Sequence, residues 1–142
     1  MLERHIRIRW RDVDAYGHVN NAVYLTYLEE ARDAWAKDVL GPSFDFVIVR
    51  IAIDYRSELS LDDEEVTVRC WGAGVGRSSI RTSERIAKRD GSLASESESV
   101  IVSHDPDTRA ARPLSDEQRE LLTAAIAVDA NVNDAGRSDG PT

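Results

Sequence analysis

Apolar and polar residues alternate along much of the chain, with the period of two that is typical of half-buried β-strands. In the first such stretch Ile6, Ile8 and Trp10 share one face, and polar residues occupy the other. In the second stretch the residues expected to point inward are Val49, Ile51, Ile53 and Tyr55. The strands that this pattern predicts cover residues 5–10, 44–56, 65–71, 78–87 and 93–103.

A different period follows the first strand. From Asn21 to Gly41, apolar residues such as Tyr27 and Ala31 recur at steps of three and four, whereas Arg32 falls among the charged residues expected to face solvent. An asparagine at position 20 or 21 is a suitable N-cap, and the glycine suits the residue after the last turn. The pattern therefore predicts one helix of about twenty residues, whose wide apolar face needs a sheet to cover it.

The order of these elements indicates the fold class. One strand and one long helix precede at least four strands that are joined by short connections, and short connections favour antiparallel pairing. We therefore predict an α+β fold in which a curved antiparallel sheet wraps around one long helix. A capping box at 115–118 opens a second helix that is expected to end near Ala127. Residues 1–128 are predicted to form a single domain, and the small, polar residues 129–142 a flexible tail.

Three serines interrupt the last predicted strand at positions 95, 97 and 99. Small side chains at these positions would let a helix or a ligand approach closely. A solvated strand face explains them equally well, and the pattern favours neither interpretation.

Composition narrows the class of protein. The chain has 142 residues, 42% of them hydrophobic and 31% charged, which is typical of a globular domain. A net charge of −8 argues against a general nucleic-acid or anionic-membrane surface. No apolar run reaches the roughly 20 residues that span a bilayer, and we expect no signal peptide. Cys70 is the only cysteine and is expected to be a small buried residue, so a reducing cytoplasm is the expected location.

The candidate chemistry lies between Arg11 and Arg32, in the stretch RDVDAYGHVNNAVYLTYLEEAR. Asp12, Asp14 and His18 occupy a polar loop immediately before the start of the predicted helix. Free backbone N–H groups at a helix N-terminus can stabilise a developing oxyanion. A carboxylate, an imidazole and such donors together suit a reaction at a carbonyl group. No Cys/His spacing resembles a zinc site, and no glycine-rich stretch matches a phosphate-binding loop.

This stretch resembles the signature of hotdog-fold thioesterases of the 4-hydroxybenzoyl-CoA thioesterase type, and the order of elements agrees over roughly residues 3–104. The resemblance implies that Asp14 is the catalytic carboxylate and that the backbone N–H of Asn21 binds the thioester carbonyl. It also implies that Arg77 and Ser78 contact coenzyme A from a central strand, and that the substrate lies near Gly17 of the motif.

Plant acyl-ACP thioesterases share part of the same pattern. The resemblance to them supports Asp14 again and implies a site role for His18, although Tyr16 stands where that family has an asparagine. The aromatic residues that could line an aromatic or an aliphatic acyl pocket are Tyr16, Tyr24, Tyr27 and Trp35. Each residue also has a purely structural interpretation: Asp14 could cap the turn, His18 could hydrogen-bond the loop, and the asparagines could serve only as caps.

A basic stripe follows the third predicted strand. Arg77, Arg81 and Arg85 share one strand face in an otherwise acidic protein. This face is either a solvated surface or a binding surface for the phosphates of coenzyme A, because guanidinium groups bind phosphate bidentately.

The function expected from these features is hydrolysis of acyl-CoA or acyl-ACP thioesters, with Asp14 as nucleophile or general base and no metal or redox cofactor. One alternative is a non-catalytic module that binds acyl-CoA or an acyl carrier, since a fold does not fix a function. Another is a hotdog hydratase, although the His/Asp spacing which that reaction needs is absent. Because a small curved sheet leaves unpaired edges, we expect a homodimer or a tetramer of dimers.

Overall fold

The computed structural model describes residues 1–137, with side chains described through residue 132. The strands are β1 (Leu2–Arg7), β2 (Phe46–Tyr55), β3 (Glu65–Val75), β4 (Ser79–Ala87), β5 (Leu93–Asp105) and β6 (Ala110–Ala111). The α-helices are α1 (Asn21–Leu40) and α2 (Asp116–Arg137), and the short 3-10 helices are η1 (Trp10–Asp12) and η2 (Leu61–Asp63).

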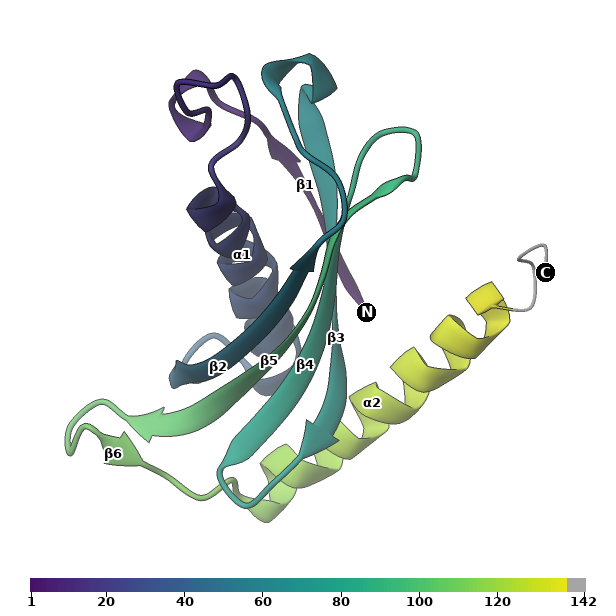
Figure 1. Ribbon diagram of the computed structural model, residues 1–142. Helices are drawn as coiled ribbons and strands as arrows, with labels where there is room; N and C mark the ends of the chain where they lie inside the picture. Colours follow the sequence, from purple (N-terminus) through teal and green to yellow (C-terminus); the bar gives the residue numbers. More distant parts are fainter. Residues whose placement is uncertain (138–142) are drawn as a thin grey trace.

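The sheet is antiparallel and curls around α1 (Figure 1). Its strand order is β1-β3-β4-β5-β2, and β6 pairs with the end of β5. The α+β fold with a curved sheet wrapped around one long helix is therefore confirmed. Helix α2 lies against β3 and α1, and it extends away from the sheet towards its C-terminal end (Figure 1). No helix within residues 1–137 is long and apolar enough to cross a membrane.

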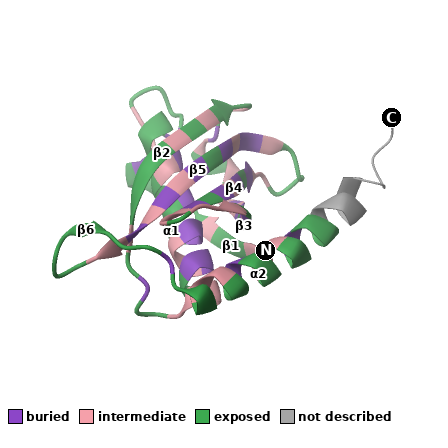
Figure 2. Cartoon of the chain, turned by 90° about the horizontal axis from the view of Figure 1, so that it is seen from below, coloured by how far each residue is buried: buried purple, intermediate pink, exposed green. Residues whose placement is uncertain are grey.

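The core lies between α1 and the concave face of the sheet, where the buried segments concentrate (Figure 2). Helix α1 contributes Tyr27, Leu28 and Trp35, all at most 2% exposed. Inward-facing residues of the central strands, including Val66 and Cys70, are fully buried beneath them. The prediction that Cys70 is a small buried residue is confirmed, and burial raises the pKa of its thiol well above the ordinary value.

Arg32 departs from the predicted amphipathic pattern, because its side chain is only 3% exposed. Its Nε donates to Glu84 on β4 at 3.1 Å, and its Nη2 donates to the Ser99 hydroxyl at 3.0 Å. Thr82 and Ser97 also donate to Glu84, at 2.8 and 2.9 Å. The prediction of a solvent-facing Arg32 is therefore wrong. Ser95, Ser97 and Ser99 are all buried, and the last two hydrogen-bond within this polar cluster, so the strand serines do not form a solvated face.

Two strand predictions were wrong at the level of single residues. Strand β1 ends at Arg7, and Trp10 begins a 3-10 turn in which it is 84% exposed. The turn forms because the Asp12 carboxylate accepts the Arg9 backbone N–H at 2.9 Å. On β2, the pairing register shifts at Val49, which is 58% exposed, so this residue does not point inward. Tyr55, at the end of this edge strand, is 45% exposed.

Helix α2 continues to Arg137, ten residues beyond the end predicted near Ala127. Its Asp129 is 1% exposed and accepts the Gly72 backbone N–H at 3.3 Å. The same carboxylate pairs with the Met1 amino group. These two partners anchor the helix past its predicted end, so residues 129–137 are helical and do not begin a tail. The remainder of the predicted tail, 138–142, lies outside the described residues.

Candidate active site

The loop before α1 holds Asp14 in a fixed turn. Oδ1 of Asp14 accepts the backbone N–H of Tyr16 at 2.9 Å and that of His18 at 3.3 Å. The Asp14 N–H donates to the His18 carbonyl at 2.8 Å, and Gly17 closes the turn with a φ of 81°. Only glycine adopts that conformation at little cost, which explains its place in the motif. Oδ2 of Asp14 has no hydrogen-bond partner among the described residues and remains available for chemistry.

The start of α1 provides a free backbone donor beside this loop. Asn20 is the N-cap, because its side-chain oxygen accepts the Ala22 N–H at 2.9 Å. The Asn20 carbonyl accepts the N–H of Val23. The N–H of Asn21 has no partner among the described residues. Helix N-termini carry a partial positive charge, so this group can stabilise an anionic oxygen.

A pocket of about 470 Å³ opens at this point. Four of the predicted site residues line it: Asp14, His18, Asn21 and Tyr24. The other lining residues are Val19, Tyr55, Arg56, Ser57 and Glu58. The sequence-predicted carboxylate, imidazole and helix terminus therefore meet at one concave surface.

The end of β2 supplies the wall that sequence reasoning missed. The Tyr55 hydroxyl donates to the Asn21 carbonyl at 2.9 Å, and the Tyr24 hydroxyl donates to the Ser57 carbonyl at 3.1 Å. The two tyrosine rings meet edge to face with centroids 5.0 Å apart. Burial raises the pKa of Tyr24, so its hydroxyl stays protonated as a donor. The alternation of the sequence placed Tyr55 at the end of a predicted strand but did not show that this strand ends beside the start of α1.

Glu58, in the connection after β2, also faces the loop. Its Oε2 lies 2.8 Å from Nε2 of His18. Arg56 lines the same wall but is engaged by carboxylates on the sheet, because its Nη2 lies 3.0 Å from Glu96 and 3.6 Å from Asp54. The pocket is therefore mainly acidic and aromatic around its imidazole.

The remaining predicted residues do not join this pocket within one chain. Tyr16 belongs to the Asp14 loop but is 85% exposed and, like Gly17, is absent from the pocket lining. Arg77 and Ser78 precede β4 in the β3–β4 turn, at the opposite end of the sheet from the start of α1 (Figure 1). The carbonyls of this turn accept the backbone N–H groups of Leu114 and Ser103.

The basic stripe is partly neutralised on the outer face of the sheet. The Arg85 guanidinium lies over the Trp71 ring, 5.4 Å from its centroid, and its Nε is 3.9 Å from Glu96. Within the described residues, no cluster of three or more His, Cys, Asp or Glu side chains could hold a metal ion.

Comparison with known proteins agrees with this architecture. Residues 8–122 match the model of the thioesterase-like superfamily. The long-chain acyl-CoA thioesterase FadM of Escherichia coli is 32% identical over 133 residues, which cover 88% of this chain and 99% of FadM.

Solved structures show the same fold. A thioesterase from Thermus thermophilus, crystallised with coenzyme A and zinc, is 33% identical with a TM-score of 0.77, covering 89% of this chain and 95% of its own. A thioesterase-superfamily structure from Jannaschia sp. CCS1 is 21% identical with a TM-score of 0.79, covering 87% of this chain and 92% of its own; it supports the fold alone. The resemblance to hotdog-fold thioesterases is therefore confirmed, and the chain belongs to the thioesterase-like superfamily.

Proposed function

We propose that this protein hydrolyses acyl-CoA thioesters to a carboxylic acid and free coenzyme A. The observation that carries the proposal is that Asp14 and Asn21, whose N–H has no partner among the described residues, line one pocket at the start of α1. The relatives support the substrate class, since FadM is a long-chain acyl-CoA thioesterase and the Thermus thioesterase was crystallised with coenzyme A. A long-chain acyl-CoA is accordingly the first substrate to test.

The chemistry follows from the two groups. With Oδ1 held by backbone donors, Asp14 either attacks the thioester carbon through Oδ2 or activates a water that does so. The carbonyl oxygen becomes an oxyanion that the Asn21 N–H stabilises, and one such donor typically contributes about 3–4 kcal/mol to lowering the barrier. The thiolate is a good leaving group and needs no strong general acid. None of these steps calls for a metal or redox cofactor.

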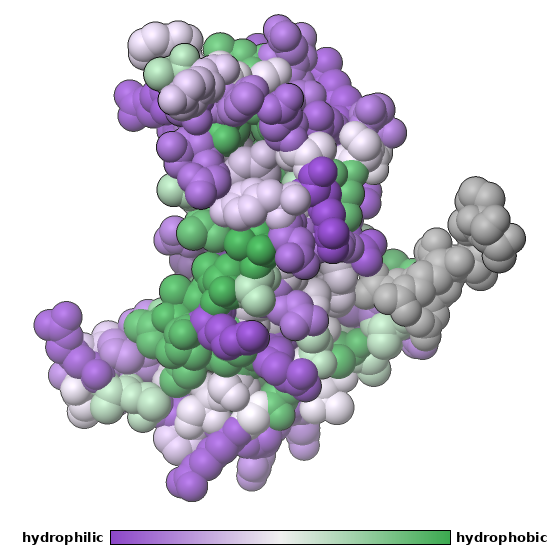
Figure 3. All heavy atoms as spheres, viewed as in Figure 1, coloured by the Kyte–Doolittle hydropathy of each residue, from purple (hydrophilic) through white to green (hydrophobic). Residues whose placement is uncertain are grey.

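The working unit in this proposal is a homodimer, alone or within a tetramer. Strand β2 lies at one edge of the sheet and exposes Val47, Ile48 and Val49, each at least 42% exposed. Figure 3 shows an apolar area in the region that β2 occupies in Figure 1. An exposed apolar edge strand favours pairing with a second copy. A second copy would also allow Arg77 and Ser78 of one chain to reach the Asp14 pocket of the other.

The test is release of free thiol from a panel of acyl-CoAs by the wild type and by Asp14→Asn. The wild type is expected to turn over at least one long-chain acyl-CoA, and Asn at position 14 is expected to lower kcat by about a hundredfold or more. The change preserves side-chain shape, so circular dichroism should be unaltered. Binding of acyl-CoA without thiol release would instead identify a non-catalytic binding module. Near wild-type turnover by Asp14→Asn would exclude Asp14 as the catalytic carboxylate.

A further inference from the structure

A second carboxylate faces the imidazole of the candidate site. Glu58 follows β2, whereas His18 belongs to the loop before α1, yet Oε2 of Glu58 lies 2.8 Å from Nε2 of His18. Both residues line the pocket that contains Asp14. The contact therefore joins two separate segments of the chain at the surface where the proposed reaction takes place.

This contact is not needed to hold the two segments together. The backbone N–H of Val19 donates to the Leu59 carbonyl at 2.7 Å, and the two residues are 5% and 0% exposed. That buried hydrogen bond already fixes the loop against the β2 connection. The side chains of His18 and Glu58 are 48% and 69% exposed, and pairs so exposed add little to stability. The contact therefore matters mainly for which nitrogen of the His18 ring carries the proton.

The carboxylate selects which ring nitrogen carries the proton. A carboxylate has only lone pairs to offer, so a ring nitrogen 2.8 Å from it must be protonated to avoid repulsion. In the neutral ring, a proton on Nε2 leaves Nδ1 as the acceptor. The two other charged groups near His18 have different partners. Asp14 accepts the His18 backbone N–H, and Arg56 pairs with carboxylates on the sheet. Within the described residues, Glu58 is the one charged side chain that forms an ion pair with the ring.

We propose that Glu58 is a positioning residue, which keeps Nε2 of His18 protonated and so presents Nδ1 as a hydrogen-bond acceptor for the hydrolytic water. This inference rests on the proposed thioesterase function and assigns a role to His18 within it. Asp14 and His18 then have separate tasks at the pocket: the carboxylate attacks the thioester carbon or activates the water, and the ring orients that water. Glu58 acts only through His18.

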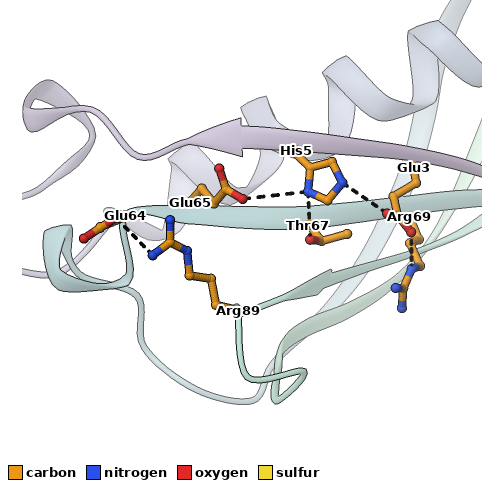
Figure 4. Close-up of polar contacts among 7 residues, drawn as sticks. All are labelled: Glu3, His5, Glu64, Glu65, Thr67, Arg69 and Arg89. Atoms are coloured by element: carbon orange, nitrogen blue, oxygen red, sulfur yellow. Dashed lines mark hydrogen bonds and ion pairs between the residues drawn. The ribbon is translucent and has the colours of Figure 1, made fainter.

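The chain offers a matched control at another histidine. His5 on β1 has Nε2 3.2 Å from Glu3 Oε1, and its Nδ1 lies 3.2 Å from the Thr67 hydroxyl (Figure 4). This histidine–carboxylate pair is similarly exposed but does not line the Asp14 pocket. Glu3→Ala is therefore expected to alter the His5 ring signals and to leave kcat unchanged.

The first measurement is kinetic, with the best acyl-CoA substrate. Glu58→Ala is expected to lower kcat about tenfold with KM nearly unchanged, a fraction of what a positioned acid–base group contributes. Glu58→Gln keeps an acceptor oxygen and should restore most of the activity. In a His18→Asn background, Glu58→Ala should cause no further loss of kcat, because Glu58 acts only through the imidazole that this background lacks. An equal loss in both backgrounds would overturn the proposal.

The second measurement needs no turnover. Nitrogen-15 spectra of the ring nitrogens, recorded where the imidazole is neutral and assigned with His18→Asn, should show His18 protonated at Nε2 in the wild type and in Glu58→Gln. In Glu58→Ala, the two ring-nitrogen signals should move towards each other as the tautomers mix. Unchanged His18 signals in Glu58→Ala would overturn the proposal, even if the protein releases no thiol from any acyl-CoA. Absence of thiol release alone would instead remove the proposed function.

Discussion

The hydroxyl of Tyr27 lies 2.7 Å from Oδ2 of Asp12 and joins helix α1 to the start of the loop that holds Asp14. Asp12 is 2% exposed and also accepts the backbone N–H and the guanidinium of Arg9. Burial acts to raise the pKa of Asp12, but the hydrogen bonds from Arg9 and Tyr27 outweigh it and hold the pKa below its usual range. The first of the two motif aspartates thus supports the loop, and the second lines the pocket.

Asp12→Asn is expected to destabilise the protein by about 1–3 kcal/mol at neutral pH, because a buried charge-assisted acceptor is lost. A depressed pKa stabilises the fold above the unfolded value of about 4, and this contribution disappears as pH falls through the folded value. The difference between wild type and variant should therefore shrink below about pH 4. Urea unfolding at several pH values measures it. A difference that stays constant into acid would contradict this assignment.

The buried Arg32–Glu84 pair gives a second prediction. Arg32→Met or Glu84→Leu alone should lower the free energy of unfolding by about 3–5 kcal/mol, because each leaves an uncompensated buried charge. The double variant should cost clearly less than the sum of the two. A double-mutant cycle in urea measures this coupling, and additive effects would show that the pair acts as two independent residues.

Coenzyme A recognition by the β3–β4 turn can be tested at Arg77. Arg77→Ala is expected to raise KM for acyl-CoA about tenfold with little change in kcat, since one charge-assisted hydrogen bond far from the reacting carbon contributes about 1.5 kcal/mol. An N-acetylcysteamine thioester lacks the nucleotide and should be unaffected. Arg4→Ala, an exposed arginine on β1, controls for the change in charge. Equal damage with both substrates would identify Arg77 as structural.

A site shared between two chains predicts complementation. Asp14→Asn and a double Arg77→Ala, Ser78→Ala variant, unfolded and refolded together and assayed at acyl-CoA concentrations below the wild-type KM, should be more active in hybrid dimers than either parent alone. Sedimentation of the wild type at assay concentration should show a dimer or a tetramer. An active monomer, or well-folded hybrids without activity, would rule out a shared site.

The sequence was sufficient for the fold because strand and helix periods depend on neighbouring residues. It was insufficient where a contact joins residues distant in the chain. The sequence predicted Arg32 as a surface residue, because its buried partner Glu84 lies on the distant strand β4. The sequence predicted Asp129 as part of a tail, because its partner Gly72 lies far away in the chain. The alternation of apolar and polar residues in the segment that forms β2 also gave no indication of the register shift at Val49.

The candidate site likewise contains residues that the sequence predicted and residues that it did not. Asp14, His18 and the start of α1 are adjacent in sequence, so one motif sufficed to predict them. Glu58 reaches His18 only because β2 ends beside the loop. Tyr55 reaches Asn21 for the same reason. In the proposed homodimer, the placement of Arg77 relative to the pocket would depend on a second chain, which no pattern within one chain specifies.

The Arg32–Glu84 pair also constrains how this sequence can diverge. Losing either partner alone would cost about 3–5 kcal/mol, against a total stability of about 5–15 kcal/mol for a typical domain. A descendant that replaced one of them would lose a large share of its free energy of unfolding before the second replacement arose. Positions 32 and 84 should therefore change together or not at all, and recombination between lineages that differ at both would produce destabilised proteins.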